Sequence, residues 1–342
     1  MTKREHSDLI MRQERNTNIK KFPVVDITPS ARSEVCMVTH RPSKNVSLAR
    51  AGAVSEYVGG VVLFCGGKDG VSGLHDDCLR YDPGADEWAE HSRMSKARYE
   101  SASAAAGQTL FVMGGVDESS VEFINASRKG AKWQSGPSLP AVTARACAAA
   151  VDSDTVILSG GHGNGSAAGS VRSARMLSAS KGKWIELAEM NHARRDHACV
   201  FVELETTSGV LVTGGLGEDD AVLDSAEFYD LNTRKWTLTS SLKQGRTEHS
   251  MSVIYGIPTV IGGLREGVFL SSLEQFDKSS SSWNVPLQRD WRVINHALNA
   301  PRYEMAVASI PISKVTVTFV GCPECCTISG FGRGEKNWGF GR

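Results

Sequence analysis

The feature that most constrains this chain is an apolar run followed by two glycines, which recurs along the sequence. The second glycines of the pairs are spaced 46 to 54 residues apart, at Gly67, Gly115, Gly161, Gly215 and Gly263. A sixth, degenerate copy ends in Gly-Cys at Cys322. Because self-similarity at this period is the sequence signature of repeat architectures, we expect one supersecondary unit per interval.

Two further signals keep step with the glycines. In four copies an aromatic or aliphatic residue precedes a tryptophan by seven positions, in the pairs Tyr81 and Trp88, Leu177 and Trp184, Tyr229 and Trp236, and Phe276 and Trp283. An arginine precedes each glycine pair by a similar distance, at Arg50, Arg98, Arg145, Arg195, Arg246 and Arg302. We therefore take these six arginines to index six repeats.

Each repeat contains four short strand candidates separated by turn residues. In the fourth repeat they are 197–203, 209–215, 225–231 and 234–240, and the second is apolar throughout, as expected for a strand covered on both faces. Units of this length with four strands predict an all-β, six-bladed β-propeller with four antiparallel strands per blade. We expect the tryptophans to fill the gaps between blades, and the glycine pairs to allow close backbone approach.

The combined pattern resembles the kelch repeat: an apolar strand, a glycine pair, Tyr81-Asp82, a spaced tryptophan, and M-x-x-x-R from Met94 to Arg98. The resemblance covers residues 50–322 and implies a kelch-type propeller that binds other proteins. It also implies two specific roles, the substrate-recognition part of a cullin-RING ubiquitin ligase adaptor or an actin and cytoskeleton binder. Kelch-like adaptors carry BTB and BACK domains before the propeller, and the residues before Arg50 are too few for either.

The ends of the chain leave the closure of the ring open. Residues 1–21 are polar and predict a disordered tail, so the propeller is expected to span residues 22–342. The sixth repeat is irregular and has no clear Tyr-Asp. One interpretation is that an N-terminal strand within residues 22–40 completes the sixth blade; the other is that Trp338 marks its outer strand.

Charge and cysteine usage narrow the class of partner. The chain has 38 basic and 38 acidic residues, which argues against nucleic acid or an anionic membrane as a partner. No segment approaches the length of a membrane span. Its eight cysteines are mostly scattered singly, which predicts reduced thiols and a cytoplasmic location.

Three motifs suggest other chemistry. Gly163, Gly165 and Ala168 match a dinucleotide fingerprint, but no helix pattern follows, so no cofactor is expected. The lone C-x-x-C at Cys322 and Cys325, next to Cys326, lacks a second ligand pair, so no metal is expected, although Cys36 or His40 could complete a half-site. We see no nucleophile paired with a histidine and predict that the chain is not an enzyme. The alternative is a propeller enzyme acting on a sugar, of the oxidase or epimerase type.

The predicted binding surface is the face that carries the loops after the second strand and before the first strand of each blade. Positions that differ between repeats are the freest to serve a partner. Two residues after the index arginines stand Gly52, Glu100, Cys147, His197, Glu248 and Glu304, near the centre of the ring. The predicted partner-binding residues are Asp69, His75, Glu100, Asp117, Glu118, His162, Asn164, His197, Glu218, Asp219, Glu248, Arg265 and Glu304. Their acidic character predicts a protein or peptide partner with a basic or hydrogen-bond-donating segment.

Overall fold

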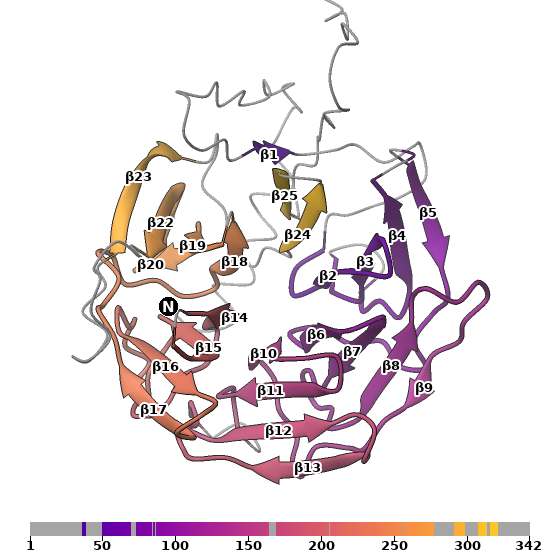
Figure 1. Ribbon diagram of the computed structural model, residues 1–342, viewed down its shortest axis with the longest axis horizontal. Helices are drawn as coiled ribbons and strands as arrows, with labels where there is room; N and C mark the ends of the chain where they lie inside the picture. The colour runs from indigo at the N-terminus through magenta and orange to yellow at the C-terminus, as the bar shows by residue number, and fades with distance from the viewer. Residues whose placement is uncertain are drawn as a thin grey trace, which may run out of the picture.

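The chain forms a β-propeller, in which four-stranded antiparallel sheets are arranged as blades around a central axis (Figure 1). The computed structural model describes residues 50–69, 73–83, 85, 87–163, 169–204, 206–254 and 256–276, together with the backbone of strands 36–38, 291–297, 307–312 and 315–320. Within each blade the strands follow one another in chain order, from the innermost to the outermost. The prediction of an all-β propeller is confirmed.

The blades have the following strands. The first contains β2 (Val54–Val58), β3 (Val61–Cys65), β4 (Cys78–Asp82) and β5 (Glu87–His91). The second contains β6 (Ala102–Ala106), β7 (Thr109–Met113), β8 (Val121–Asn125) and β9 (Gln134–Ser135). The third contains β10 (Cys147–Ala150), β11 (Thr155–Ser159), β12 (Ala174–Ser178) and β13 (Lys183–Glu186). The fourth contains β14 (Ala198–Glu203), β15 (Ser208–Thr213), β16 (Ala226–Asp230) and β17 (Lys235–Leu238). The fifth contains β18 (Ser250–Ile254), β19 (Ile257–Ile261), β22 (Ser272–Phe276) and β23 (Trp291–Ala297), with the small hairpin β20 (Leu264–Arg265) and β21 (Val268–Phe269) between β19 and β22.

The prediction of six four-stranded blades is wrong, because the described residues form five such blades. The sixth place is taken by a three-stranded sheet of β1 (Cys36–Val38), β25 (Val315–Val320) and β24 (Val307–Ile312). The hairpin of β24 and β25 is antiparallel, whereas β1 pairs with β25 in parallel. In Figure 1 this sheet lies between β2 and β18, and β24 contacts both. The strand β1 therefore lies beside β25, the last strand among the described residues. Residues 1–21 and Trp338 lie outside the described residues.

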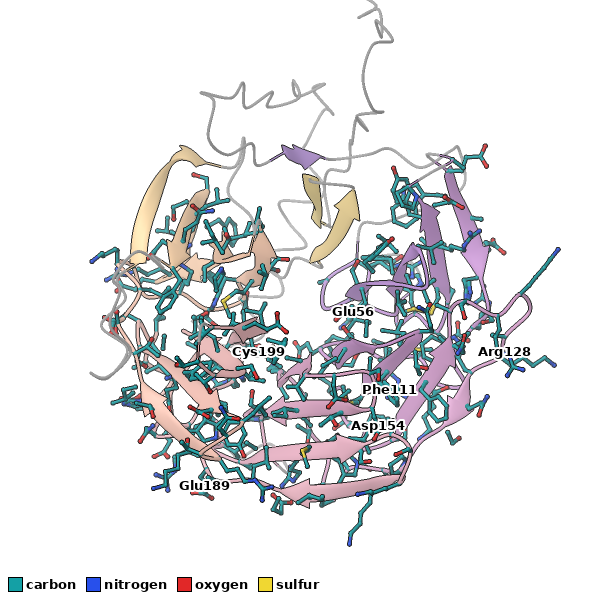
Figure 2. The ribbon with its side chains drawn as sticks, viewed as in Figure 1. Glu56, Phe111, Arg128, Asp154, Glu189 and Cys199 are labelled. Atoms are coloured by element: carbon teal, nitrogen blue, oxygen red, sulfur yellow. A yellow bond between two sulfur atoms is a disulfide. The ribbon has the colours of Figure 1, made fainter. Side chains whose placement is uncertain are left out.

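The hydrophobic core lies between neighbouring blades. All five residues of β3 are buried, and the second strands of the other four blades are buried except at their first residue. Their side chains form clusters that each combine two adjacent blades, such as Val112 with Leu63 and Val156 with Phe111. In Figure 2 Phe111 lies inside the ring of blades, whereas the exposed Arg128 lies at its outer rim. Burial on both faces explains why these strands read as continuous apolar runs.

The glycine pairs occur where two blades approach each other through their backbones. A Cβ on Gly214 would lie 2.5 Å from the carbonyl oxygen of Arg246 in the next blade, and Gly214 has a φ of +58°. The second glycine, Gly215, would meet its own blade, because a Cβ there would lie 2.5 Å from Arg195 O. Equivalent crowding occurs at the pairs of the first three blades and at Gly263. No larger residue fits these positions without displacing backbone.

Tryptophans link the second, third and fourth blades each to the blade before it. The indole Nε1 atoms of Trp133, Trp184 and Trp236 donate to backbone carbonyls of the preceding blade, at 2.8, 2.8 and 2.9 Å. Trp236 also stacks at a tilt on Tyr229, with ring centroids 5.1 Å apart. The expectation that tryptophans join adjacent blades is confirmed for these three residues.

The prediction that all eight cysteines are reduced is wrong for four of them. Cys65 and Cys78 form a disulfide across the directly paired strands β3 and β4, and Cys147 and Cys199 form one between the innermost strands of the third and fourth blades. Strand pairing and blade packing bring together cysteines that are far apart in the sequence. Cysteine usage therefore gives no support for a reducing compartment, and the cytoplasmic location stays a prediction. No helix in the described part of the chain is long and apolar enough to cross a membrane.

Candidate functional site on the loop face

One face of the propeller carries the loops that follow each second strand and precede each first strand; we call it the loop face. Single β-bridges hold the two kinds of loop together, between Ala51 and Lys68 in the first blade, Arg195 and Leu216 in the fourth, and Thr247 and Leu264 in the fifth. The predicted grouping of these loops is therefore present. The predicted site residues Asn164 and Glu304 lie outside the described residues.

Beneath the loop face, the second, fourth and fifth blades each contain a buried ion-pair network of the same design. Arg98 Nη1 donates to the carbonyls of Gly114 and Ser120, both at 3.0 Å, while its Nη2 donates to Ser120 Oγ at 3.0 Å and Glu122 Oε1 at 2.7 Å. Arg194 and Arg246 repeat all four contacts in their own blades. All three arginines are fully buried or nearly so, and their guanidinium charge is neutralised by a buried glutamate.

Two of the six index arginines were misassigned. Arg194, not Arg195, occupies the buried position of the fourth blade, while Arg195 Nη2 reaches Asp220 at the surface. In the third blade Thr143 occupies the position of the buried arginine. Its carbonyl accepts a hydrogen bond from the second glycine of the preceding pair, Gly115, just as the Arg98 carbonyl accepts one from Gly67. Arg145 stands two residues further on. Arg302 lies outside the described residues.

The corrected register brings one residue from each blade into an inner ring, which we define as Gly52, Glu100, Arg145, Asp196 and Glu248. All five have a positive φ, between 53° and 62°. Each amide from Glu100 onward donates to the carbonyl of the ring residue in the preceding blade, at 2.9, 2.8, 2.9 and 2.9 Å. The prediction that Gly52, Glu100 and Glu248 are equivalent is correct. In the third and fourth blades the equivalent residues are Arg145 and Asp196, and the predicted Cys147 and His197 follow them in the chain.

The side chains of the inner ring set three carboxylates around one guanidinium. Arg145 contacts both carboxylate oxygens of Glu100, at 2.7 and 2.6 Å, and Asp196 Oδ2 at 3.0 Å. Burial opposes the charged form of Arg145, but Asp196, Glu100 and Glu248 outweigh it and raise the pKa of the guanidinium. Burial raises the pKa of Asp196, against the attraction of Arg145. The ring thus combines three acidic residues with one arginine, and this excess of acidic groups favours a cationic ligand.

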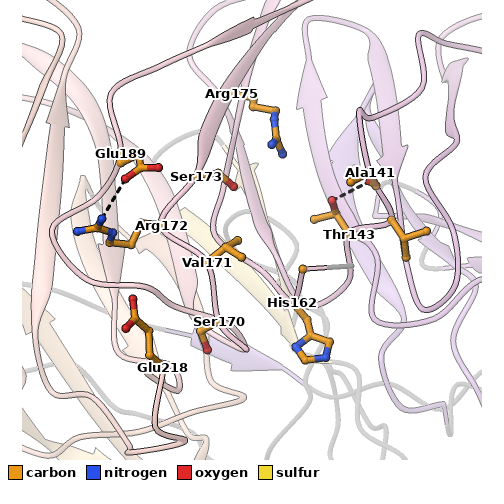
Figure 3. A pocket seen from close by; sticks show the side chains of 12 residues that line it. Ala141, Thr143, His162, Ser170, Val171, Arg172, Ser173, Arg175, Glu189 and Glu218 are labelled. Atoms are coloured by element: carbon orange, nitrogen blue, oxygen red, sulfur yellow. Dashed lines mark hydrogen bonds and ion pairs between the residues drawn. The ribbon is translucent and has the colours of Figure 1, made fainter. Parts of the chain in front are cut away.

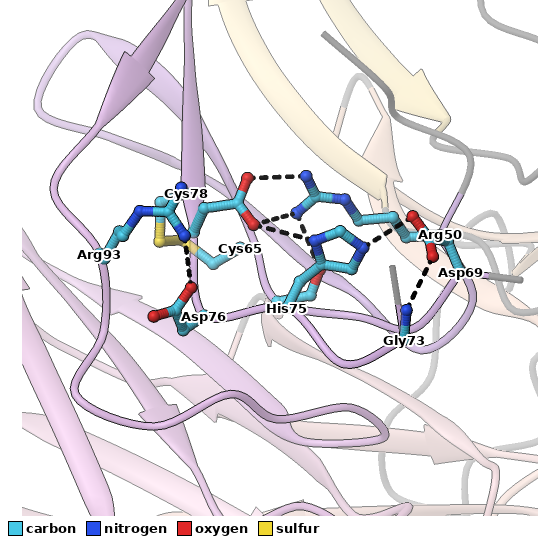
Figure 4. Close-up of polar contacts among 10 residues, drawn as sticks. Arg50, Cys65, Asp69, Gly73, His75, Asp76, Cys78 and Arg93 are labelled. Carbon is cyan, nitrogen blue, oxygen red and sulfur yellow. Dashed lines mark hydrogen bonds and ion pairs between the residues drawn. A yellow bond between two sulfur atoms is a disulfide. The ribbon is translucent and has the colours of Figure 1, made fainter. Parts of the chain in front are cut away.

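In the first blade, two predicted residues belong to a partly buried polar network (Figure 4). His75 Nε2 lies 2.9 Å from Asp69 Oδ2, and His75 Nδ1 lies 3.0 Å from Asp77 Oδ1. Asp77 also pairs with Arg50 at 2.7 Å, and Asp69 accepts from the amide of Gly73. Burial would raise the pKa of Asp77, but its contacts with Arg50 and His75 lower it below its ordinary value. The network ties Asp69, His75 and Asp77 to one another and to Arg50.

The remaining predicted residues differ in accessibility. Glu118 accepts from Lys96 Nζ at 2.7 Å and from the amide of Ser120; these contacts outweigh burial and lower its pKa to about 2. Asp117, Asp219 and Arg265 are exposed. His197 is only 6% exposed, and burial, aided by the charge of Arg194, lowers its pKa to about 3. It packs between two glycine pairs rather than facing solvent.

A pocket of about 400 Å³ opens beside the third blade (Figure 3). His162 and Glu218, both predicted as binding residues, line it. The other lining residues are Ala141, Val142, Thr143, Gly163, Ser170, Val171, Arg172, Ser173, Arg175 and Glu189. Its size lies within the usual range of ligand pockets. Across the described ranges, no three His, Cys, Asp or Glu side chains are grouped to hold a metal ion.

Comparison with known proteins identifies the repeat. The chain is 24% identical to Kelch-like protein 15 of Homo sapiens over 234 residues, which is 64% of this chain and 39% of that protein. It is 35% identical to an F-box/kelch-repeat protein of Arabidopsis thaliana over 103 residues, 30% of this chain and 26% of that protein. It is 28% identical to alpha-scruin of Limulus polyphemus over 112 residues, 31% of this chain and 12% of that protein. The chain resembles the kelch-repeat propellers in sequence and in fold. No family model matches it. The matches span well under half of these relatives.

Sequence reasoning missed two residues of the inner ring, Arg145 and Asp196. A signal for Asp196 was present, because aligning His197 with His249 places Arg194 beside Arg246 and Asp196 beside Glu248. The positive φ that defines the inner ring has no comparable signal, since four of its five residues are not glycine.

Proposed function

We propose that this chain is a protein–protein interaction module that binds a basic peptide segment of its partner across the loop face. The observation that carries the proposal is the inner ring, in which Glu100 and Asp196 contact the Arg145 guanidinium and Glu248, from a third blade, adds its charge. Loops on a rigid scaffold are where binding residues concentrate, and complementary charge favours a cationic segment. The similarity to kelch-repeat proteins supports an interaction module.

Two finer forms of this function follow from the kelch resemblance. One is the substrate-recognition part of a cullin-RING ubiquitin ligase adaptor, and the other is an actin or cytoskeleton binder in the cytoplasm. Precipitation of a cullin with the tagged chain supports the first, and co-sedimentation with actin filaments supports the second. Neither form requires catalysis by the propeller, and the absence of enzyme activity stays a prediction.

Charge preference on the loop face can be measured directly. Fluorescence anisotropy with labelled decapeptides of alternating arginine and serine, or glutamate and serine, should show binding of the basic peptide alone. Glu218 is exposed on the loop face, while Glu203 is exposed at the hairpin between β14 and β15, where first and second strands connect. These residues allow the same charge reversal on opposite faces.

We expect Glu218→Lys to weaken binding of the basic peptide about fivefold, as for loss of about 1 kcal/mol of surface attraction. Glu203→Lys should leave the affinity unchanged, because it lies on the other face. Equal binding of the two decapeptides, or an equal effect of both substitutions, would overturn the proposal.

A further inference from the structure

The third blade lacks the buried ion-pair network of its neighbours. Thr143 stands where the second, fourth and fifth blades have the arginine. On β12, Arg175 pairs with Leu158 in the register that places Glu122 opposite Val112 and Glu227 opposite Val212. Both members of the ion pair are therefore replaced in this blade.

A third member of the network is replaced at the same time. In the other blades the glutamate accepts from a backbone amide of the preceding loop: Ser95 donates to Glu122 at 2.7 Å and Lys243 donates to Glu274 at 2.7 Å. The equivalent residue in the third blade is Pro140, which follows Leu139 as Ser95 follows Met94, and proline has no amide hydrogen to donate. The third blade therefore lacks both the glutamate that accepts this hydrogen bond and the amide that donates it.

The oxygen atoms that would hold the arginine are still in place. Gly160 donates to the Ser173 carbonyl at 2.8 Å, as Gly214 donates to Ser225 at 3.0 Å. Gly160 O, Ser173 O and Ser173 Oγ therefore correspond to the three oxygens that accept from Arg194 in the fourth blade. Among the side chains that the structure describes, none donates to Gly160 O or Ser173 Oγ.

The pocket of about 400 Å³ lies at the place of the missing arginine, since Thr143, Ser173 and Arg175 all line it (Figure 3). Each arginine in its wall has an acidic partner: Arg175 Nε lies 2.7 Å from Glu186, and Arg172 Nη2 lies 3.2 Å from Glu189. Glu218, also in the wall, forms no ion pair with any described residue. Backbone carbonyl oxygens accept hydrogen bonds and do not bind anions, so the pocket suits a cationic donor.

We propose that this pocket binds an arginine side chain of the partner, whose guanidinium takes the place of the missing repeat arginine. Ser173, which lines the pocket, accepts its hydrogen bonds through its carbonyl oxygen and its Oγ, and Glu218 supplies the nearby negative charge. Arginine suits the site better than lysine, because its planar fork presents several donors in a fixed geometry. The proposal rests on the proposed function, since it assigns one side chain of the bound basic segment to one pocket.

The test compares the arginine and serine decapeptide with its lysine counterpart, which has the same charge. We expect the arginine peptide to bind about tenfold more tightly, the effect of one charge-assisted hydrogen bond. The double variant Thr143→Arg with Arg175→Glu rebuilds the repeat network and fills the pocket, so it should abolish the preference for arginine while both peptides still bind. Ser173→Ala is a second variant that removes one acceptor without filling the pocket, and should reduce the preference.

The outcomes separate the two proposals. If both basic peptides bind equally well to the unaltered chain, the pocket proposal is overturned and the proposed function stands. If neither basic peptide binds, the proposed function is overturned; titration with N-acetyl-arginine amide, monitored by the amide NMR signals of Gly160 and Ser173, then tests the pocket alone. Binding of the glutamate and serine peptide that is lost in Arg175→Gln would show an anion site instead.

Discussion

The third and fourth blades have the same strand order and matching backbone contacts, yet one encloses a buried ion pair and the other a pocket. In the fourth blade Arg194 and Glu227 fill the space under the loop face, with side chains that are 0% exposed. In the third blade Thr143 and Arg175 leave the space open. The oxygen atoms around the guanidinium come from the strand and glycine geometry that every blade shares. The repeat therefore provides a cation site, which the second, fourth and fifth blades fill with an arginine paired to a glutamate and the first blade fills with Arg50.

The largest effect should come from breaking the ion pair where it is buried. Arg194→Met leaves Glu227 as an uncompensated buried charge, and we expect it to lower the free energy of unfolding by about 3–5 kcal/mol. Arg175→Met in the third blade removes a charge whose partner, Glu186, is 63% exposed, and should cost less than about 1 kcal/mol. Urea unfolding of both variants measures the difference. Similar losses of stability in the two variants would contradict the difference between a buried ion pair in the fourth blade and an exposed one in the third.

The glycine pairs should be the next most sensitive positions in every blade. Gly214 and Gly182 have nearly the same φ, +58° and +56°, but a Cβ on Gly182 would meet nothing within 4 Å. We expect Gly182→Ala to cost about 1 kcal/mol for the left-handed backbone alone. Gly214→Ala should cost about 1–3 kcal/mol more, because its Cβ would clash with Arg246 O in the next blade. Equal losses in thermal unfolding would contradict the blade contact seen at this glycine.

The sequence predicted those parts of the molecule that repeat, and was least informative where the repeat is broken. The glycine pairs and tryptophans have similar spacings in most copies, and spacing alone identified the propeller. The sequence alone could not show which of the adjacent residues Arg194 and Arg195 is the buried repeat arginine, because this depends on which side chain points into the blade. Cys147 and Cys199 lie 52 residues apart and meet only because two blades pack together.

The pocket did leave a sequence signal that went unnoticed. Three blades have Ser-x-Glu before or at the third strand, at Ser120, Ser225 and Ser272, whereas the third blade has Ser173-Ala174-Arg175. Pro140 and Thr143 change with it. A departure shared by three interacting positions is a stronger sign of a site than the glycine-rich stretch beside it.

The two kinds of blade should also differ in their response to pH. The fourth blade buries His197, where the third has the small Ala146, and the pKa of His197 is about 3 in the folded chain against 6.5 for the free side chain. The unfolded chain therefore binds a proton between these values and the folded chain does not. His197 thus contributes fully to stability above pH 6.5, and this contribution falls as the pH is lowered. We expect a loss of about 2 kcal/mol from this histidine between pH 7 and pH 5.

Urea unfolding at the two pH values checks this expectation. The His197→Ala variant should lose about 2 kcal/mol less than the unaltered chain over the same interval, whatever its stability at pH 7. His249, at the equivalent place in the fifth blade, is also buried, and burial together with the charge of Arg246 lowers its pKa, so His249→Ala should behave in the same way. An unchanged pH dependence in both variants would show that folding does not lower the pKa of these histidines.

The smallest expected difference in stability concerns the tryptophans of the outer strands in the third and first blades. Trp184 Nε1 donates to Pro137 O at 2.8 Å, whereas Trp88 Nε1 in the first blade is buried and has no hydrogen-bond partner among the described residues. Phenylalanine at either position removes ring area, but only Trp184→Phe also removes a hydrogen bond between blades. We expect it to cost about 1 kcal/mol more than Trp88→Phe in urea unfolding. An equal cost of the two substitutions would mean that ring packing, and not the hydrogen bond from Trp184 to Pro137 O, holds the third blade to the second.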